Sequence, residues 1–449
     1  MGYIPNTPED RKAMLSAMGY SSFEELLRSA VPDELLCQRS PKLPEPLSEM
    51  EGLAEAWALS ATNADSASFI SFLGAGAYDH YIPAAVGHIT SRPEFATAYT
   101  PYQAEVSQGT LQAIFEFQSL IARLTGMDVA NASMYDGPTA LAEAVLMAVG
   151  EKRCERILVP EHLHPHYLKV LKTYTHPTGI ELITVPAKGG ITDYAKLAEM
   201  ADDTIAAAVI QNPNFAGCIE DGFAFAEAIE KSGAELLAVA DPISLGMLTP
   251  PGEYGADIAL GEAQPLGNSV GFGGPYIGFF GAREKHVRKM PGRLIGASTD
   301  DKGTRGFVMT LQTREQHIRR EKATSNICTN EALCALSATV YLSLMGEGGF
   351  KEIASQCYHK AHYLAGKLAE IEGVEMVYDD SFFREFAVRL SMPAREFVEA
   401  MAANGFLAGV PMQRFYPERE NELLIAVTEK RSKTEMDNFA EVTAEVLNA

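Results

Sequence analysis

Ala206-Ala-Ala-Val-Ile210, Leu236-Leu-Ala-Val-Ala240 and Asp257-Ile-Ala-Leu260 are the three apolar runs that decide the fold. Each has the length of one β-strand, and an unbroken apolar run is typical of a strand that is buried on both faces. Further runs of this kind, interleaved with helical patterns such as Pro138–Val149, are Arg156–Val159, Glu181–Val185 and Tyr276–Phe280. Strands that alternate with helices predict an α/β fold with a mainly parallel central sheet and helices on both faces.

The sequence changes character on either side of these strands. Residues 1–65 contain short helical pieces interrupted by prolines, which end helices, so we expect an N-terminal helical arm there. Residues 66–320 form the predicted large α/β domain. Residues 321–449 begin with a long helical stretch and continue with alternating segments such as Phe386–Leu390 and Glu422–Val427, which predicts a small C-terminal α+β domain.

The composition excludes several classes of protein. Among 449 residues, 37 Lys and Arg stand against 59 Asp and Glu, a formal net charge of −22. Such a field repels phosphate backbones and anionic lipid surfaces, so we expect neither a nucleic-acid partner nor a membrane partner. The six cysteines are scattered without C-x-x-C spacing, which argues against a structural zinc site and a disulfide framework. With no apolar leader and no long uninterrupted apolar run, we expect a cytoplasmic protein.

The residues that follow the apolar runs are the first candidates for a site, because ligands of open α/β sheets bind at the carboxyl ends of the strands. Here they are Asn212, Asp241 and the segment Gly261–Asn268. Asp241 is followed by proline, and Asp-Pro after a strand is often only a turn initiator or a cap. Its local sequence therefore leaves its role open.

Two clusters of titratable residues need an interpretation. His162, His164 and His166 suggest a metal site, because imidazoles are common zinc ligands. Pro165 interrupts regular spacing, so a loop or a packing role is favoured, and no metal site is predicted. The basic run after Thr313 either binds an anionic group on a partner or forms a solvated helix face; it comprises Arg314, His317, Arg319, Arg320 and Lys322.

Three longer motifs carry a resemblance to a known family. They are Ala98-Tyr-Thr-Pro-Tyr-Gln-Ala-Glu-Val-Ser-Gln-Gly109, Asn131-Ala-Ser133 and the stretch from Gln312 to Thr329. Together they closely resemble the N-terminal half of glycine decarboxylase, the P-protein of the glycine cleavage system, over about residues 60 to 345. The length resembles the separate α subunit of P-proteins that are split in two. The resemblance implies the aminotransferase-like architecture of fold-type I pyridoxal-phosphate enzymes.

Such enzymes need a lysine for the cofactor aldehyde, a carboxylate for its pyridinium nitrogen and a helix N-terminus for its phosphate. Asp241 stands where the carboxylate is expected, but Gln264 occupies the expected lysine position, and an amide cannot form the imine. At the expected phosphate turn, Asp136 places a negative charge. We therefore regard Asp136, His162, Asp241 and Gln264 as remnants of a cofactor site, with no cofactor bound covalently to this chain and no certain catalytic residue.

The resemblance also implies the reaction and the partners. A P-protein β subunit would carry pyridoxal phosphate, in a heterodimer or heterotetramer with this chain. The pair would decarboxylate glycine and transfer the aminomethyl group to the lipoyl group of H-protein, with T-protein and L-protein as functional partners. Because segments of one subunit complete the other's pocket in dimers of this fold, the candidates for that role are Tyr99, Thr100, Tyr102, Gln103, Gly74 and Gly76. The alternative for the tyrosine-rich stretch is a buried packing loop.

Two rival functions remain open from the sequence. One is a self-sufficient pyridoxal-phosphate aminotransferase or lyase that uses another lysine, such as Lys169, Lys285 or Lys289. The other is a scaffold or regulatory protein that keeps the fold without contributing to a pocket.

Overall fold

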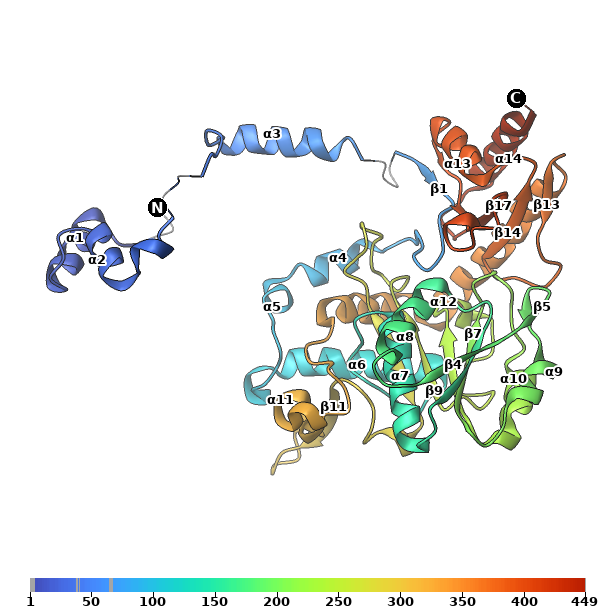
Figure 1. The fold of residues 1–449 in the computed structure, drawn as a ribbon, viewed down its shortest axis with the longest axis horizontal. Coiled ribbons are helices and arrows are strands. Elements are labelled where there is room, and N and C mark those ends of the chain that lie inside the picture. Colours follow the sequence, from blue (N-terminus) through green and yellow to red (C-terminus); the bar gives the residue numbers. More distant parts are fainter. Residues whose placement is uncertain (1–4, 38, 40, 64–67, 449) are drawn as a thin grey trace. The chain divides into compact units, whose positions relative to one another are not determined.

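The computed structural model describes residues 5–37, 39, 41–63 and 68–448 (Figure 1). The chain divides into two units, Met1–Ala64 and Asp65–Ala449. The first contains α1 (Pro8–Ala17), α2 (Phe23–Ala30) and α3 (Glu49–Ser60). None of the described residues in these three helices is buried, so the helices do not build a core between them.

The second unit is built on a seven-stranded sheet with the order β2-β10-β9-β8-β7-β3-β4. In that order the strands are Val129–Ala130, Gly278–Ala282, Ile258–Glu262, Glu235–Ala240, Ile205–Asn212, Arg156–Pro160 and Glu181–Val185. The five strands from β9 to β4 are parallel, whereas β10 pairs antiparallel with β9 and β2. The prediction of a mainly parallel sheet is confirmed.

Helices cover both faces of this sheet (Figure 1). Side chains at alternating positions of its strands contact the helices on opposite faces. Leu237 of β8 packs in one apolar cluster with α7 (Gly137–Lys152) and α8 (Pro165–Thr175). Its neighbours Leu236 and Ala238 pack in another cluster with α9 (Tyr194–Met200) and α10 (Gly222–Ile229). Successive side chains of a central strand face opposite sides of the sheet, and helices cover both sides. The central runs are therefore apolar without interruption.

A four-stranded antiparallel sheet follows in the C-terminal part, with the order β13-β14-β17-β16. These strands are Val374–Met376, Glu385–Leu390, Glu422–Ala426 and Val410–Pro411. The helices α13 (Ala394–Ala403) and α14 (Lys433–Asn448) pack on it through Phe397 and Phe439. This is an α+β arrangement.

The long helix α12 (Ala332–Ala369) joins the two sheets. Tyr341 and Phe350 of α12 pack in a cluster with the large sheet, whereas Leu364 and Leu368 pack with the small one. Among the described helices α12 alone is long and apolar enough to cross a membrane, a criterion that core helices of soluble proteins also meet.

Of the remaining elements, α6 (Gln108–Thr125) packs against the large sheet through Phe117 and Ile121. The bounds of the others are α4 Ala84–Thr90, α5 Pro93–Ala96, α11 Gln316–Arg319, β1 Ile70–Ser71, β5 Ala187–Lys188, β6 Ile191–Thr192, β11 Leu294–Thr299, β12 Arg305–Thr310 and β15 Phe406–Leu407. β1 pairs with β15, so the chain just after residue 68 is attached to the C-terminal part.

Candidate functional site

A pocket opens at the carboxyl ends of β7, β8 and β9, where the sequence predicted a ligand site. It holds about 600 Å³ of space free of protein atoms, part of which is open to solvent. Its polar wall comes from segments far apart in the chain, and the side chains that matter below are Tyr78, His164, Asp241, Glu262, Arg384 and Glu385.

Asp241 follows β8 and has two partners. One carboxylate oxygen accepts a hydrogen bond from the Ile243 N–H at 3.0 Å, which is the turn cap that the sequence offered as one of two alternatives. The other lies 2.7 Å from Nη2 of Arg384, a side chain that is almost completely buried directly before β14. The guanidinium also stacks on the Tyr78 ring, 3.6 Å from its centroid. Asp241 therefore pairs with a cation, and that cation belongs to the protein itself.

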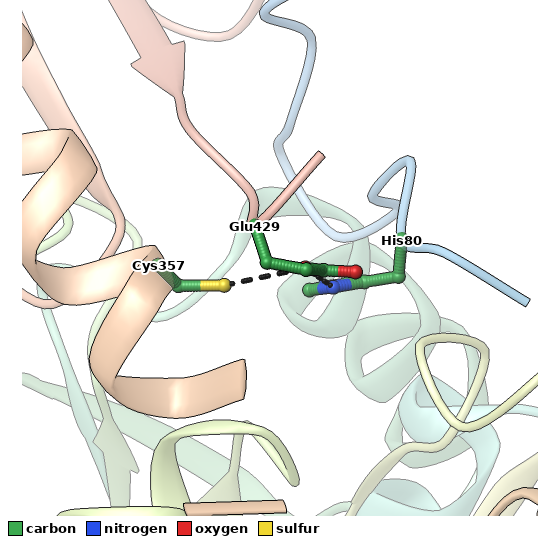
Figure 2. A group of neighbouring side chains, drawn as sticks. All are labelled: His80, Cys357 and Glu429. Carbon is green, nitrogen blue, oxygen red and sulfur yellow. Dashed lines mark hydrogen bonds and ion pairs between the residues drawn. The ribbon is translucent and has the colours of Figure 1, made fainter. Parts of the chain in front are cut away.

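Beyond Arg384 the buried network continues to His80, Glu429 and Cys357 (Figure 2). His80 Nδ1 lies 2.6 Å from Glu429 Oε2, and Cys357 Sγ lies 3.5 Å from the same oxygen. Imidazole, thiol and carboxylate in such proximity are ligand types that zinc binds.

The neighbouring arginine decides against a metal there. His80 Nε2 faces the Arg384 guanidinium, which can only donate hydrogen bonds. Nε2 must therefore accept a hydrogen bond, and the ring proton is on Nδ1, which donates a hydrogen bond to Glu429. Nδ1 then has no lone pair for a metal. Burial lowers the pKa of the His80 imidazole, consistent with a neutral ring. The cluster is a hydrogen-bonded chain that ends at the pocket.

Residues 74–81, which we call the strap, run along the pocket and are tied down by Gln264. The Gln264 amide accepts from the Tyr78 N–H at 2.9 Å and donates to the Tyr78 carbonyl at 3.2 Å. It also donates to the Asn268 carbonyl at 2.7 Å. The residue at the expected lysine position is thus a buried structural amide.

Glu385 provides a second attachment of the strap. Its carboxylate accepts from the Ala75 N–H at 2.6 Å and from the Tyr78 hydroxyl at 2.9 Å. Gly74 and Gly76 have no room for a side chain because neighbouring side chains lie close to their backbone. A Cβ on Gly74 would collide with Glu385, and one on Gly76 would lie 2.9 Å from His164 Nε2. Both glycines therefore shape this chain's own pocket.

The N-terminus of α7 contacts Glu262, which lines the pocket. Asp136 is its N-cap, and its carboxylate accepts from the Thr139 N–H at 2.8 Å. The Gly137 N–H donates instead to Glu262 Oε2 at 3.1 Å, so a carboxylate from the end of β9 lies where the helix would attract an anion.

The sequence placed Glu262 only within the candidate segment Gly261–Asn268 and gave it no role of its own; in the structure it is the last residue of β9. Its second oxygen accepts from the N–H groups of Gln264 and Ile277, both at 3.1 Å. Burial raises the pKa of this carboxyl to about 8, although the three N–H donors oppose that shift.

The three histidines have different surroundings. His162, which was predicted to be a remnant of the cofactor site, is buried against Tyr378 and does not line the pocket. His164 lines it instead: its Nδ1 accepts from the His166 N–H at 3.0 Å, so its Nε2 donates to the Ala75 carbonyl at 2.8 Å. Burial lowers the pKa of His164 to about 4.

The tyrosine-rich stretch lies outside this pocket. Tyr99 and Tyr102 are 73% and 55% exposed, so they do not form a buried packing loop. Arg293, itself buried, donates to Thr100 Oγ1 at 3.3 Å and lies 5.6 Å from the Tyr102 ring centroid. Tyr99 Oη lies 3.4 Å from Thr329 Oγ1. The motif Ala98–Gly109 and the stretch from Gln312 to Thr329 thus lie side by side at the surface, and Gln103 is exposed beside them.

The basic run is divided between short helical turns and does not form one helix face. Arg314 is partly buried and donates to the carbonyls of Met290 and Gly292, so it is committed to the backbone. Arg319 donates to the Thr313 carbonyl. This part of the run has a local structural role.

The three lysines that a self-sufficient enzyme was expected to use are not at the pocket. Lys285 pairs with Asp257 at 2.7 Å, beside the start of β9 and therefore at the opposite edge of the sheet. Lys169 and Lys289 are exposed. Within the described ranges, no lysine lines the pocket.

The residues at the expected cofactor contacts do not fit pyridoxal phosphate. The lysine position holds Gln264, the anion position at α7 is filled by Glu262, and the carboxylate of Asp241 is already paired with Arg384. No chemical step is therefore assigned to a cofactor on this chain.

Comparisons with known proteins agree over the whole length. The family model described as glycine cleavage system P-protein matches residues 1–443, well beyond the stretch in which the sequence motifs were found. A protein of Carboxydothermus hydrogenoformans named probable glycine dehydrogenase (decarboxylating) subunit 1 is 52% identical over 442 residues, 98% of this chain and 99% of that one. Its counterpart in Moorella thermoacetica is 53% identical over 441 residues, 97% and 98% of the two chains.

Solved structures agree as well. A crystal structure of glycine decarboxylase (P-protein) of the glycine cleavage system, in inhibitor-bound form, has a TM-score of 0.92 and 44% identity, and the match covers 100% of both chains. Glutamate decarboxylase of Lactobacillus brevis has a TM-score of 0.69 at 12% identity over 93% of this chain and 96% of that one, which shows a shared fold alone.

Proposed function

Since this chain belongs to the glycine cleavage system P-protein family, as a subunit of glycine dehydrogenase (decarboxylating), we propose that it is the cofactor-free member of a two-chain enzyme. The observation that carries this proposal is that the cofactor contacts are already taken by protein groups: Arg384 neutralises Asp241, and Gln264 stands where the lysine is expected. The cofactor and its lysine then belong to a second subunit, in a heterodimer or heterotetramer.

In that complex the partner's pyridoxal phosphate supplies the electron sink for decarboxylation of glycine. The contribution of this chain is the exposed surface around Tyr99 and Tyr102, which Arg293 holds against the segment that ends at Thr329. Aromatic rings with hydroxyl groups exclude water and still donate a hydrogen bond, which suits a wall of the partner's active site. We place the complex in the cytoplasm, acting on the lipoyl arm of H-protein together with T-protein and L-protein.

Reconstitution tests this assignment. The purified chain should show no glycine–bicarbonate exchange until a second subunit with an intact lysine is added, and activity of the isolated chain would refute the proposal. In the active complex, Tyr102→Phe should lower kcat about 10-fold or more if the Tyr102 hydroxyl contributes to the partner's active site. Tyr363→Phe is the matched control, because the Tyr363 hydroxyl bonds Asp437 in the C-terminal part. Equal activity of both variants would favour a scaffold without a pocket role.

A further inference from the structure

The described pocket contains a carboxylate and a guanidinium at two places where a pyridoxal-phosphate enzyme meets the charged ends of its cofactor. The cofactor presents an anionic phosphate to a helix N-terminus and a cationic pyridinium to an aspartate. Here Glu262 accepts the free N–H of Gly137 at the start of α7, and Arg384 lies 2.7 Å from Asp241. Glu262 supplies acceptor oxygens to the helix N–H, as the phosphate would, and Arg384 supplies a cation to Asp241, as the pyridinium would.

We propose that Glu262 and Arg384 are built-in substitutes for the two ends of the cofactor, so that restoring a lysine at residue 264 alone does not create a pyridoxal-phosphate site. This concerns the isolated chain and does not depend on the partner proposed above. It goes beyond the lost lysine, because it says that the remainder of the site has been filled as well.

The neighbouring contacts support this proposal. Glu262 has three backbone N–H donors, from Gly137, Gln264 and Ile277, so its carboxyl cannot leave without exposing three unpaired donors. Arg384 is held from a second side by the Tyr78 ring, 3.6 Å from its guanidinium carbon. A phosphate or a pyridinium would have to displace groups that are already bonded.

The same contacts hold the strap in place along the pocket. Tyr78 stacks on Arg384, bonds Gln264 through its backbone and Glu385 through its hydroxyl. The substitutes thus belong to the packing of the strap, and we expect this chain to fold and hold the strap in place without any cofactor.

Covalent labelling tests the proposal on the full chain. Wild type, Gln264→Lys and the triple variant Gln264→Lys/Glu262→Ala/Arg384→Met are incubated with pyridoxal phosphate, reduced with borohydride and mapped by peptide mass. In Gln264→Lys we expect residue 264 to be labelled no more than the exposed Lys169. Stoichiometric labelling at residue 264 in this single variant would overturn the proposal, and labelling only in the triple variant would support it.

Chemical rescue provides an independent measurement, which also serves if the lysine variants do not fold. Glu262→Ala should melt at a lower temperature than wild type and regain at least half of that loss in inorganic phosphate, compared with chloride at equal ionic strength. Because phosphate stabilises folded proteins in general, wild type and the exposed control Glu253→Ala should gain only this smaller, common amount. If Glu262→Ala is too unstable to purify, its refolding yield in phosphate and in chloride is compared. A gain in Glu262→Ala no larger than that in wild type and in Glu253→Ala contradicts the proposal.

Discussion

Asp241 Oδ2 lies 2.7 Å from Arg384 Nη2, so the carboxylate at the end of β8 is neutralised by a side chain that directly precedes β14. The pair connects the large sheet to the C-terminal sheet inside the pocket. Because Arg384 also contacts His80 and Tyr78, it is the residue on which the wall of the pocket most depends.

Removing Arg384 should therefore be costly. Arg384→Met leaves Asp241 and His80 without their partner, and we expect the free energy of unfolding to fall by about 3–5 kcal/mol. Urea denaturation measures this, and in a double-mutant cycle Asp241→Asn should add less to Arg384→Met than to wild type. Arg395→Met is the control, since the Arg395 side chain is 80% exposed. A loss as small as that of the control would mean that the buried pair does not stabilise the fold.

Gln264 should hold the strap. Gln264→Leu leaves the Tyr78 N–H and carbonyl without their side-chain partner, and each buried unpaired group costs about 1–3 kcal/mol. Hydrogen exchange should accelerate in residues 74–81 more than in β8. The exposed Gln112→Leu should leave exchange unchanged. Unaltered protection of the strap in Gln264→Leu would show that Glu385 alone suffices.

Glu262 should make stability depend on pH. Its folded pKa of about 8 lies above its usual value of 4.5, so the folded protein binds the additional proton between these values. The contribution is fully present below the lower value and is lost as the pH rises through the higher one. Relative to Glu262→Gln, wild type should lose about 2–3 kcal/mol between about pH 6 and about pH 9. A constant difference between the two proteins would mean that this carboxyl is ionised throughout.

His286 should stabilise the folded protein at the opposite edge of the large sheet. It is buried, with Nδ1 2.8 Å from Glu151 and Nε2 3.1 Å from Glu235. Burial opposes the charged forms, but this pairing raises the pKa of His286 and lowers that of Glu235 to about 2. The histidine contribution is complete below its usual pKa and is lost at alkaline pH, whereas the Glu235 contribution is lost as the pH falls from 4.5 toward 2.

We therefore expect His286→Gln to cost about 3 kcal/mol at about pH 6, with a smaller effect at about pH 9. Thermal and urea unfolding across that range measure the difference. His359→Gln is the control, because His359 is exposed. If the cost of His286→Gln grew with rising pH, the histidine would be neutral in the folded protein.

Gly76 should not tolerate a side chain. Its φ of +105° is unfavourable for other residues, and a Cβ would lie 2.9 Å from His164 Nε2. Gly76→Ala should lower the free energy of unfolding by about 1–3 kcal/mol. Gly150→Ala, inside α7 with open space around it, should instead stabilise the protein by about 0.5–1 kcal/mol. A neutral Gly76→Ala would show that the strap moves away from His164 at little cost.

Much of the architecture could be predicted from local patterns. Buried strands such as Leu236–Ala240 are apolar at every position because both faces are covered, and this is visible without any contact information. The strand direction of Tyr276–Phe280 was not visible, because an antiparallel strand in a covered position has the same apolar pattern. The meeting of Tyr99 with Thr329 was equally hidden, since 230 residues separate them in the chain.

Three properties can be read from the residues alone: the fold is α/β, the motifs are those of the P-protein family, and residue 264 is glutamine, which cannot form an imine. Which protein groups occupy the cofactor contacts depends on tertiary packing. Asp241 and Arg384 are 143 residues apart, and Gly137 and Glu262 are 125 apart. Partners at such separations are chosen by the packing of whole strands and helices, whereas the chemistry of a single side chain is fully present in its residue type.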